Sequence, residues 1–233
     1  MKTDIKAILF DIDDTLFDRK QAQLKVLHKI VDSLPEVFST LDFHRVAEAS
    51  AESDRLTIAE FDAGATSDGI RDRRNKLLLK ILGLPEIIAP KLSEIYIREL
   101  PVCDAPVAGA VQLIRELSGK YELGAVSNGL PDVQYGKLET IGVRNMLSCI
   151  VLSEEIGMRK PDPKIFLYAA RLLGRQPDEC LFVGDSYTSD IVGAKNAGMC
   201  ACWFNPAKSP IQSEEIKPDF VVNNLLDIPA LLK

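Results

Sequence analysis

The feature that most constrains the fold is a short apolar run at residues 5–10 that ends abruptly in acids. Parallel strands buried on both faces have such runs, because neither face needs polar residues. Similar runs recur at 122–127, 148–152, 180–184, 200–204 and, more weakly, 220–222. Stretches with helical periodicity separate them, at 107–118, 131–141, 163–173 and 190–197. Strands that alternate with helices predict right-handed crossovers and an α/β fold with a doubly wound parallel sheet.

The interval from 17 to 100 has a different pattern. It contains no convincing strand, but amphipathic helical segments occur at 21–34, 44–61, 69–82 and 89–100. A loop of this length without structure would be exceptional. We therefore expect a smaller, all-helical domain at 17–100, inserted into an α/β domain made of residues 1–16 and 101–233.

Composition excludes some classes of function. The formal net charge of −6 argues against a nucleic-acid polymer as partner, because phosphate backbones require clustered Lys and Arg. No apolar run approaches the roughly 20 residues that span a bilayer, and no signal peptide precedes the first acids. The sequence predicts a soluble, cytoplasmic protein without a membrane partner, and it leaves the oligomeric state open.

Five cysteines are present, an odd number without a Cys-x-x-Cys pair. Cys200 and Cys202 would share one face of a strand, so a metal or redox pair is conceivable there. Free cysteines are more often small buried hydrophobic residues. We favour that interpretation for Cys103, Cys149, Cys180, Cys200 and Cys202.

Polar residues follow several of the predicted strands and strand-associated loops. They are Asp11, Asp13 and Thr15 after the first strand, Ser127 and Asn128 after the second, Lys160 beyond the third, and Asp185 and Asp190 after the fourth. Singly, such residues are often turn residues or helix caps. Together they matter more, because ligands bind beyond the carboxyl ends of strands in open α/β sheets. Acids combined with a hydroxyl and a lysine predict a site for Mg²⁺ and a phosphoryl group.

Each residue type suits a role in that chemistry. Mg²⁺ prefers oxygen ligands, which Asp11 and Asp185 would supply, although Mn²⁺ accepts the same ligands. A carboxylate such as Asp11 can act as a nucleophile and form an acyl-phosphate. A second carboxylate, Asp13, can protonate the leaving oxygen and later deprotonate water. Lys160 and Ser127 would stabilise charge on the transferring phosphoryl group.

Four segments resemble the motifs of the haloacid dehalogenase-like (HAD) hydrolases, in the order of that family. They are Asp-Ile-Asp-Asp-Thr at 11–15, Ser-Asn-Gly at 127–129, Arg-Lys-Pro-Asp-Pro at 159–163 and Gly-Asp-Ser-Tyr-Thr-Ser-Asp at 184–190. The resemblance implies a Rossmann-like core and a helical cap domain inserted after the first strand. It covers 5–14 and about 106–222.

The resemblance also implies residue roles. Asp11 is similar to the family's nucleophile and Asp13 to its general acid/base. The implied metal shell consists of Asp11, the Asp13 backbone carbonyl and Asp185, with Asp190 as a further ligand or as a residue that orients the metal-bound waters. The residues that resemble the phosphate site are Thr15, Ser127, Asn128 and Lys160.

The family catalyses several reactions, so the residues must favour one. Dehalogenases of the family lack an acid two residues after the nucleophile, whereas Asp13 is present here. This favours a Mg²⁺-dependent phosphomonoester hydrolase of small phosphorylated metabolites. A phosphomutase with the same core, or a non-catalytic binding module, are the alternatives. The segments at 127–130, 150–160 and 184–199 look most similar to the nucleoside-monophosphatase, pyrimidine 5′-nucleotidase-like branch. This similarity suggests a nucleoside monophosphate as substrate.

Specificity is expected to depend on the helical insertion. Candidates are Phe17, Arg19 and the basic cluster Arg71, Arg73 and Arg74. For that cluster we favour an exposed helix face paired with Asp68 and Asp72. Trp203 is interpreted as a packing residue.

Overall fold

The computed structural model describes residues 4–62, 68–213 and 215–232, and the chain divides into two compact units. The core unit comprises Met1–Lys20 and Asp104–Lys233, and the helical unit comprises Gln21–Cys103. Residues 1 and 233, the outer limits of the predicted α/β domain, lie outside the described residues. Within the described part of the chain, no helix has the length and apolar character needed to cross a membrane.

The core unit is built on a sheet of six strands. These are β1 (Ala7–Phe10), β2 (Glu122–Ser127), β3 (Cys149–Leu152), β4 (Cys180–Gly184), β5 (Cys200–Phe204) and β6 (Phe220–Val222). Their order is β3-β2-β1-β4-β5-β6, and every pairing is parallel. The chain therefore has the predicted doubly wound α/β fold. The central strand β1 is buried over all four residues, in keeping with its continuous apolar run.

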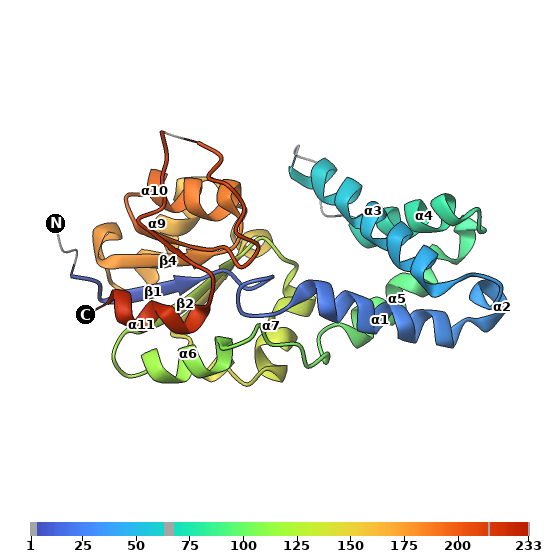
Figure 1. Ribbon diagram of the computed structural model, residues 1–233, viewed down its shortest axis with the longest axis horizontal. Coiled ribbons are helices and arrows are strands. Elements are labelled where there is room, and N and C mark those ends of the chain that lie inside the picture. The colour runs from blue at the N-terminus through green and yellow to red at the C-terminus, as the bar shows by residue number, and fades with distance from the viewer. Residues whose placement is uncertain (1–3, 63–67, 214, 233) are drawn as a thin grey trace. The chain divides into compact units, whose positions relative to one another are not determined.

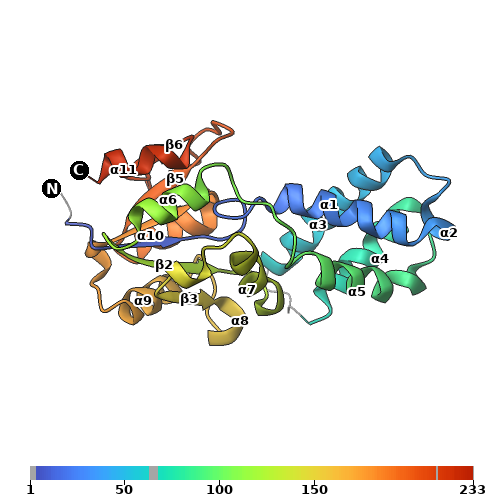
Figure 2. The ribbon, with the colours of Figure 1, turned by 90° about the horizontal axis from the view of Figure 1, so that it is seen from below.

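Helices cover both faces of this sheet (Figures 1 and 2). One face carries α9 (Pro163–Leu172) and α10 (Val192–Asn196), and the other carries α6 (Ala110–Leu117) and α11 (Ile228–Leu231). The remaining helices of the core unit are α7 (Pro131–Thr140), α8 (Ser153–Ile156), the π-helix η4 (Tyr187–Ile191) and the 3₁₀ turns η2 (Arg144–Met146), η3 (Pro177–Glu179) and η5 (Leu225–Asp227). Phe166 of α9 packs edge-to-face on Phe182 of β4, with ring centroids 4.8 Å apart.

Several predicted elements differ from the structure at their ends, and the first strand and the helix predicted from residue 190 are two of them. The first strand begins at Ala7, because Lys6 is exposed and pairs with Glu179 instead of continuing the buried run. The helix predicted from residue 190 is divided into the π-helix Tyr187–Ile191 and α10. The wider π turn places Asp190 in the interior of the core unit, with no solvent exposure.

The helical unit confirms the helices predicted from amphipathic spacing. Its elements are α1 (Arg19–Ser33, which starts in the core unit), α2 (Pro35–Phe38), α3 (Phe43–Asp62), α4 (Ile70–Leu82), the 3₁₀ turn η1 (Glu86–Ile88) and α5 (Ala89–Glu99). Helix α4 packs against α3 and α5. It ends at Leu82 and is capped by Gly83, whose φ of 72° suits a residue without a Cβ.

The interpretation of the basic cluster on α4 was wrong for Arg74. Its side chain is only 12% exposed, its guanidinium lies 3.9 Å from the centroid of the Tyr96 ring, and it approaches Asp54 at 3.8 Å. Asp72 accepts a hydrogen bond from the Ser93 hydroxyl of α5. Arg73 donates to the backbone carbonyl of Asp68. Arg74 packs on the aromatic ring because a guanidinium is planar and weakly hydrated.

The interpretations of the cysteines and of Trp203 are confirmed. All five thiols are free, and four of them are buried. Burial raises the pKa of Cys149, Cys200 and Cys202 to about 12, so these thiols are poor nucleophiles and metal ligands. Trp203 packs against Tyr187 with ring centroids 5.2 Å apart.

Candidate active site

Three carboxylates converge at the carboxyl ends of the neighbouring strands β1 and β4. Asp11 directly follows β1, Asp185 directly follows β4, and Asp190 lies on the π-helix after β4. One oxygen from each of the three lies within 4.8 Å of the others. In the part of the chain that the structure describes, this is the group of acids able to hold a metal ion together.

Lys160 reaches into this acidic cluster from the loop between α8 and α9. Its Nζ lies 2.5 Å from Asp11 Oδ1 and 2.7 Å from Asp190 Oδ1. The lysine side chain is 3% exposed and that of Asp190 is fully buried. The structure thus brings together residues that are 149 positions apart in the sequence.

The backbone around Asp190 is shaped to admit its carboxylate. A Cβ at Gly184 would lie 2.3 Å from Asp190 Oδ2, so any other residue there would displace the acid. The Ser186 amide donates to the same oxygen at 3.0 Å. Asp190 therefore has a fixed orientation, as expected of a residue that positions a ligand.

The electrostatics of the cluster favour a bound cation. Burial raises the pKa of Asp11, and the charges of Asp190 and Asp185 raise it further, although Lys160 opposes them. Burial and Asp190 likewise raise the pKa of Asp185 to about 7. For Lys160, the charges of Asp11 and Asp190 outweigh the effect of burial and raise its pKa, so it stays protonated. One ammonium faces three carboxylates, so a divalent cation would offset the remaining repulsion.

The loop after β1 folds back tightly on itself. The Leu16 and Phe17 amides both donate to the Ile12 carbonyl at 2.9 Å, and Asp14 adopts a left-handed φ of 56°. Asp is among the residues that tolerate this conformation. Thr15 is fully buried, and its Oγ1 has no hydrogen-bond partner among the described residues.

Asn128 connects two of the predicted site segments. Its side-chain Nδ2 donates to the Lys160 carbonyl, and its Oδ1 accepts from the Lys160 amide, both at 2.9 Å. Ser127, which is 2% exposed, accepts a hydrogen bond from the Gly129 amide at 3.0 Å. Asn128 therefore holds the backbone of Lys160 in place through two hydrogen bonds, while Ser127 is the last residue of β2.

Sequence reasoning missed two residues on α7 that contact Asp13. Lys137 Nζ lies 2.6 Å from Asp13 Oδ1, and Gln134 Nε2 donates to Asp13 Oδ2 at 3.0 Å. Burial alone would raise the pKa of Asp13, but the charges of Lys137 and Arg19 and these hydrogen bonds lower it overall. The available signal was two polar residues one helical turn apart, within a helix that also buries Val133 and Leu138.

The specificity candidates Phe17 and Arg19 have internal contacts in the core unit. Phe17 is fully buried, and the Lys137 ammonium lies 5.2 Å from its ring centroid. Arg19 lies 3.9 Å from the Asp14 carboxylate, to which its backbone amide also donates. Both residues thus brace the loop after β1.

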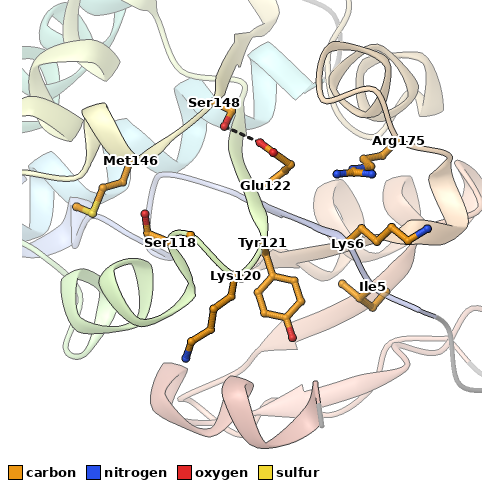
Figure 3. Close-up of a pocket in the computed structure, with 10 residues that line it drawn as sticks. Ile5, Lys6, Ser118, Lys120, Tyr121, Glu122, Met146, Ser148 and Arg175 are labelled. Atoms are coloured by element: carbon orange, nitrogen blue, oxygen red, sulfur yellow. Dashed lines mark hydrogen bonds between the residues drawn. The ribbon is translucent and has the colours of Figure 1, made fainter.

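A separate pocket of about 440 Å³ lies at the amino ends of β1 and β2 (Figure 3). Its lining includes Lys6, Tyr121, Glu122 and Arg175, and Glu122 accepts a hydrogen bond from Ser148. None of the acids of the cluster lines it. This pocket and the acidic cluster therefore lie at opposite edges of the sheet. The buried charges are concentrated in the acidic cluster, which makes the cluster the candidate active site.

Comparison with protein families gives a match over most of the chain. A family model described as haloacid dehalogenase-like hydrolase matches residues 5–198. This interval contains all eight residues of the predicted site.

Individual relatives agree with this match. Pyrimidine 5′-nucleotidase YjjG of Escherichia coli is 39% identical over 144 residues, covering 61% of this chain and 63% of the relative. Glyceraldehyde 3-phosphate phosphatase of Methanopyrus kandleri is 30% identical over 96% of this chain and 97% of its own length. The magnesium-bound crystal structure of the HAD-hydrolase YfnB from Bacillus subtilis has a TM-score of 0.84 at 28% identity, covering 98% and 99% of the two chains.

Proposed function

This chain belongs to the haloacid dehalogenase-like hydrolases, and we propose that it is a phosphoester hydrolase that uses Mg²⁺ and an aspartyl-phosphate on Asp11. The main support for this proposal is the buried group of Asp11, Asp185, Asp190 and Lys160 at the carboxyl edge of the sheet. Relatives named as phosphatases align over nearly the whole chain. They support phosphate esters as the substrate class.

The residues present fit a magnesium ion. Asp11, Asp185 and Asp190 offer hard carboxylate oxygens within 4.8 Å of one another, and the backbone carbonyl of Asp13 is a fourth donor in this proposal. Bound Mg²⁺ would supply charge neutralisation for the phosphoryl group and the attacking carboxylate. The magnesium in the crystal structure of YfnB is consistent with this assignment.

In the first step, an oxygen of the Asp11 carboxylate attacks phosphorus while the ester P–O bond breaks. Asp13 donates a proton to the leaving alcohol oxygen. The negative charge of the bound phosphoryl group would oppose the lowering of its pKa by Lys137 and Arg19 and so favour the protonated form. Lys160 and the Ser127 hydroxyl, with Asn128 holding the Lys160 backbone, would stabilise the transferring phosphoryl group. The buried hydroxyl of Thr15, in the loop after β1, is a further proposed ligand of the phosphoryl group.

In the second step, water attacks the phosphorus of the aspartyl-phosphate and the bond to Asp11 breaks. Asp13 accepts the proton of that water, which restores it for the next cycle. The products are an alcohol and inorganic phosphate, and Asp11 is regenerated as a carboxylate. Two displacements at phosphorus thus replace one slow hydrolysis.

The substrate is proposed to be a small phosphorylated metabolite, with nucleoside monophosphates as the first class to test. The relative of 39% identity is named a pyrimidine 5′-nucleotidase, while longer alignments are to phosphatases of a three-carbon sugar phosphate. The proposed division of labour places catalysis in residues 1–16 and 101–233 and selection of the alcohol in a helical cap at 17–100. A cytoplasmic location stays a prediction.

The test is phosphate release by the full chain from nucleoside monophosphates, sugar phosphates and phosphoglycolate, with Mg²⁺ and with EDTA. We expect metal-dependent release from at least one class. Equal amounts of alcohol and free phosphate would distinguish a hydrolase from a phosphomutase. Absence of release from every ester in the presence of Mg²⁺ would contradict the proposed function.

A further inference from the structure

We propose that Gln134 and Lys137 of α7 are positioning residues that together orient the Asp13 carboxylate and the Ser127 hydroxyl for phosphoester cleavage. The inference rests on the proposed function, because it assigns a task to two residues outside the four motifs. Both are polar side chains buried at 0% and 2% exposure on a helix that follows the Ser-Asn-Gly segment.

Lys137 fixes one oxygen of Asp13. The 2.6 Å contact from Nζ to Asp13 Oδ1 joins a lysine side chain that is 3% exposed to an aspartate that is 23% exposed. Burying an ammonium is costly unless it is paired with an opposite charge. The burial of the Lys137 ammonium beside Asp13 therefore indicates that this ion pair holds both side chains in place. Asp13 keeps a solvent-facing portion, which a reacting proton donor needs.

Gln134 holds the other carboxylate oxygen of Asp13 and also the hydroxyl of Ser127. Its Nε2 donates to Asp13 Oδ2 at 3.0 Å and to Ser127 Oγ at 2.6 Å. A Cβ at Gly129 would lie 2.1 Å from the same Nε2, so glycine at this position makes the room that Gln134 occupies. One amide thus connects the proposed acid/base with the proposed phosphate ligand.

The pattern of donors determines where the serine proton can point. Ser127 Oγ accepts from both the Gly129 amide and Gln134 Nε2, so its two lone pairs are engaged. Its own O–H is then left to donate to a further acceptor, and a phosphoryl oxygen is such an acceptor. Gln134 accordingly makes Ser127 a donor while it aligns Asp13.

This assignment predicts a dependence on the leaving group. A nitrophenolate departs without a proton, whereas an alkoxide needs one from Asp13. Misplacing Asp13 should therefore slow alkyl esters much more than p-nitrophenyl phosphate. A general loss of folding or of phosphate binding would slow both substrates alike.

The experiment measures kcat/KM of wild type, Lys137→Met and Gln134→Met with p-nitrophenyl phosphate and with the alkyl ester that wild type hydrolyses fastest in the panel, both with Mg²⁺. For Lys137→Met we expect a loss of about 10²-fold on the alkyl ester and of less than about tenfold on the aryl ester. Gln134→Met should also lose more activity on the alkyl ester than on the aryl ester. Its loss on the aryl ester should exceed that of Lys137→Met, because Ser127 loses its hydrogen bond as well. Lys120→Met, at an exposed lysine outside the site, is the control and should match wild type.

The outcomes separate this inference from the proposed function. Wild type that releases no phosphate overturns both. Wild type that is active, with variants that lose activity equally on the two esters or retain it on both, overturns only the positioning role. If Lys137→Met has a thermal midpoint too low for assay, the selectivity of Gln134→Met decides in the same way.

Discussion

The two edges of the core sheet hold ion pairs of the same length in opposite surroundings. At the carboxyl edge, Lys160 and Asp11 are 2.5 Å apart with side chains 3% and 10% exposed. At the amino edge, Lys6 and Glu179 are also 2.5 Å apart, but their side chains are 42% and 26% exposed. Buried charges cost several kcal/mol per ion before pairing, whereas exposed pairs contribute little either way. Burial, and not the contact distance, distinguishes a functional charge cluster from a surface pair.

The largest effect is expected for Asp11→Asn. An amide is a poor nucleophile, so activity should fall by roughly 10⁴-fold or more, as when a catalytic nucleophile is removed elsewhere. Phosphate release with Mg²⁺ measures this, and wild type but not the variant should yield an acid-stable trapped phosphoprotein. Glu122→Gln at the amino edge is the matched control and should retain activity. Substantial turnover by Asp11→Asn would remove Asp11 from its proposed role.

A smaller loss is expected for Lys160→Met. This change leaves Asp11 and Asp190 without their shared cation and removes a preorganised charge from the phosphoryl site. We expect kcat to fall by about 10²-fold. Lys6→Met, which breaks a pair of equal length at the amino edge, should leave kcat unchanged. If both variants had equal activity, the distinction between the two edges would be wrong.

A gain in stability is expected for Asp185→Asn in the metal-free protein. The folded-state pKa of Asp185, about 7, lies above its unfolded value, so stability is lost as pH rises toward and through 7. The amide removes that cost, and at pH 8 the thermal midpoint should rise by roughly 2–4 °C. The gain should shrink at pH 5, where the folded carboxyl is already protonated. Asp178→Asn, an exposed acid beside the amino edge, should show no such gain at either pH.

The smallest effect is expected for Lys6→Met in thermal unfolding. The Lys6–Glu179 pair is exposed, so salt and water screen it and its loss is nearly neutral. The thermal midpoint should move by less than about 2 °C. A decrease comparable with that of a core substitution would show that the amino edge is held by this pair after all.

Much of the fold could be predicted from the sequence because local patterns and the tertiary structure agree. The runs that became β2, β4 and β5 were predicted to the residue, since a strand buried on both faces has no polar interruptions. The first strand was predicted two residues too long, because Ile5 and Lys6 resemble the run, although Lys6 is exposed and the paired strand begins at Ala7. The motif residues Asp11 and Asp185 could be found because they follow such strands directly.

Residues that act across elements could not be predicted in this way. Gln134 and Lys137 lie 121 and 124 positions from Asp13 in the sequence, and nothing in α7 alone indicates which acid they contact. Arg74 was assigned to its own helix face, but its partners Asp54 and Tyr96 belong to α3 and α5. Pairings of this kind depend on how helices pack, which periodicity does not specify.

Local patterns of burial and of neighbouring residues were enough to predict the strand and helix types, the insertion after the first strand and the set of acids at strand ends. Tertiary structure decided which charges meet. Parallel pairing of β1 with β4 brings Asp11 beside Asp185, the π-helix buries Asp190, and Lys160 joins them from another loop. Long-range geometry sets the distances between charges, and those distances determine the electrostatics of the site.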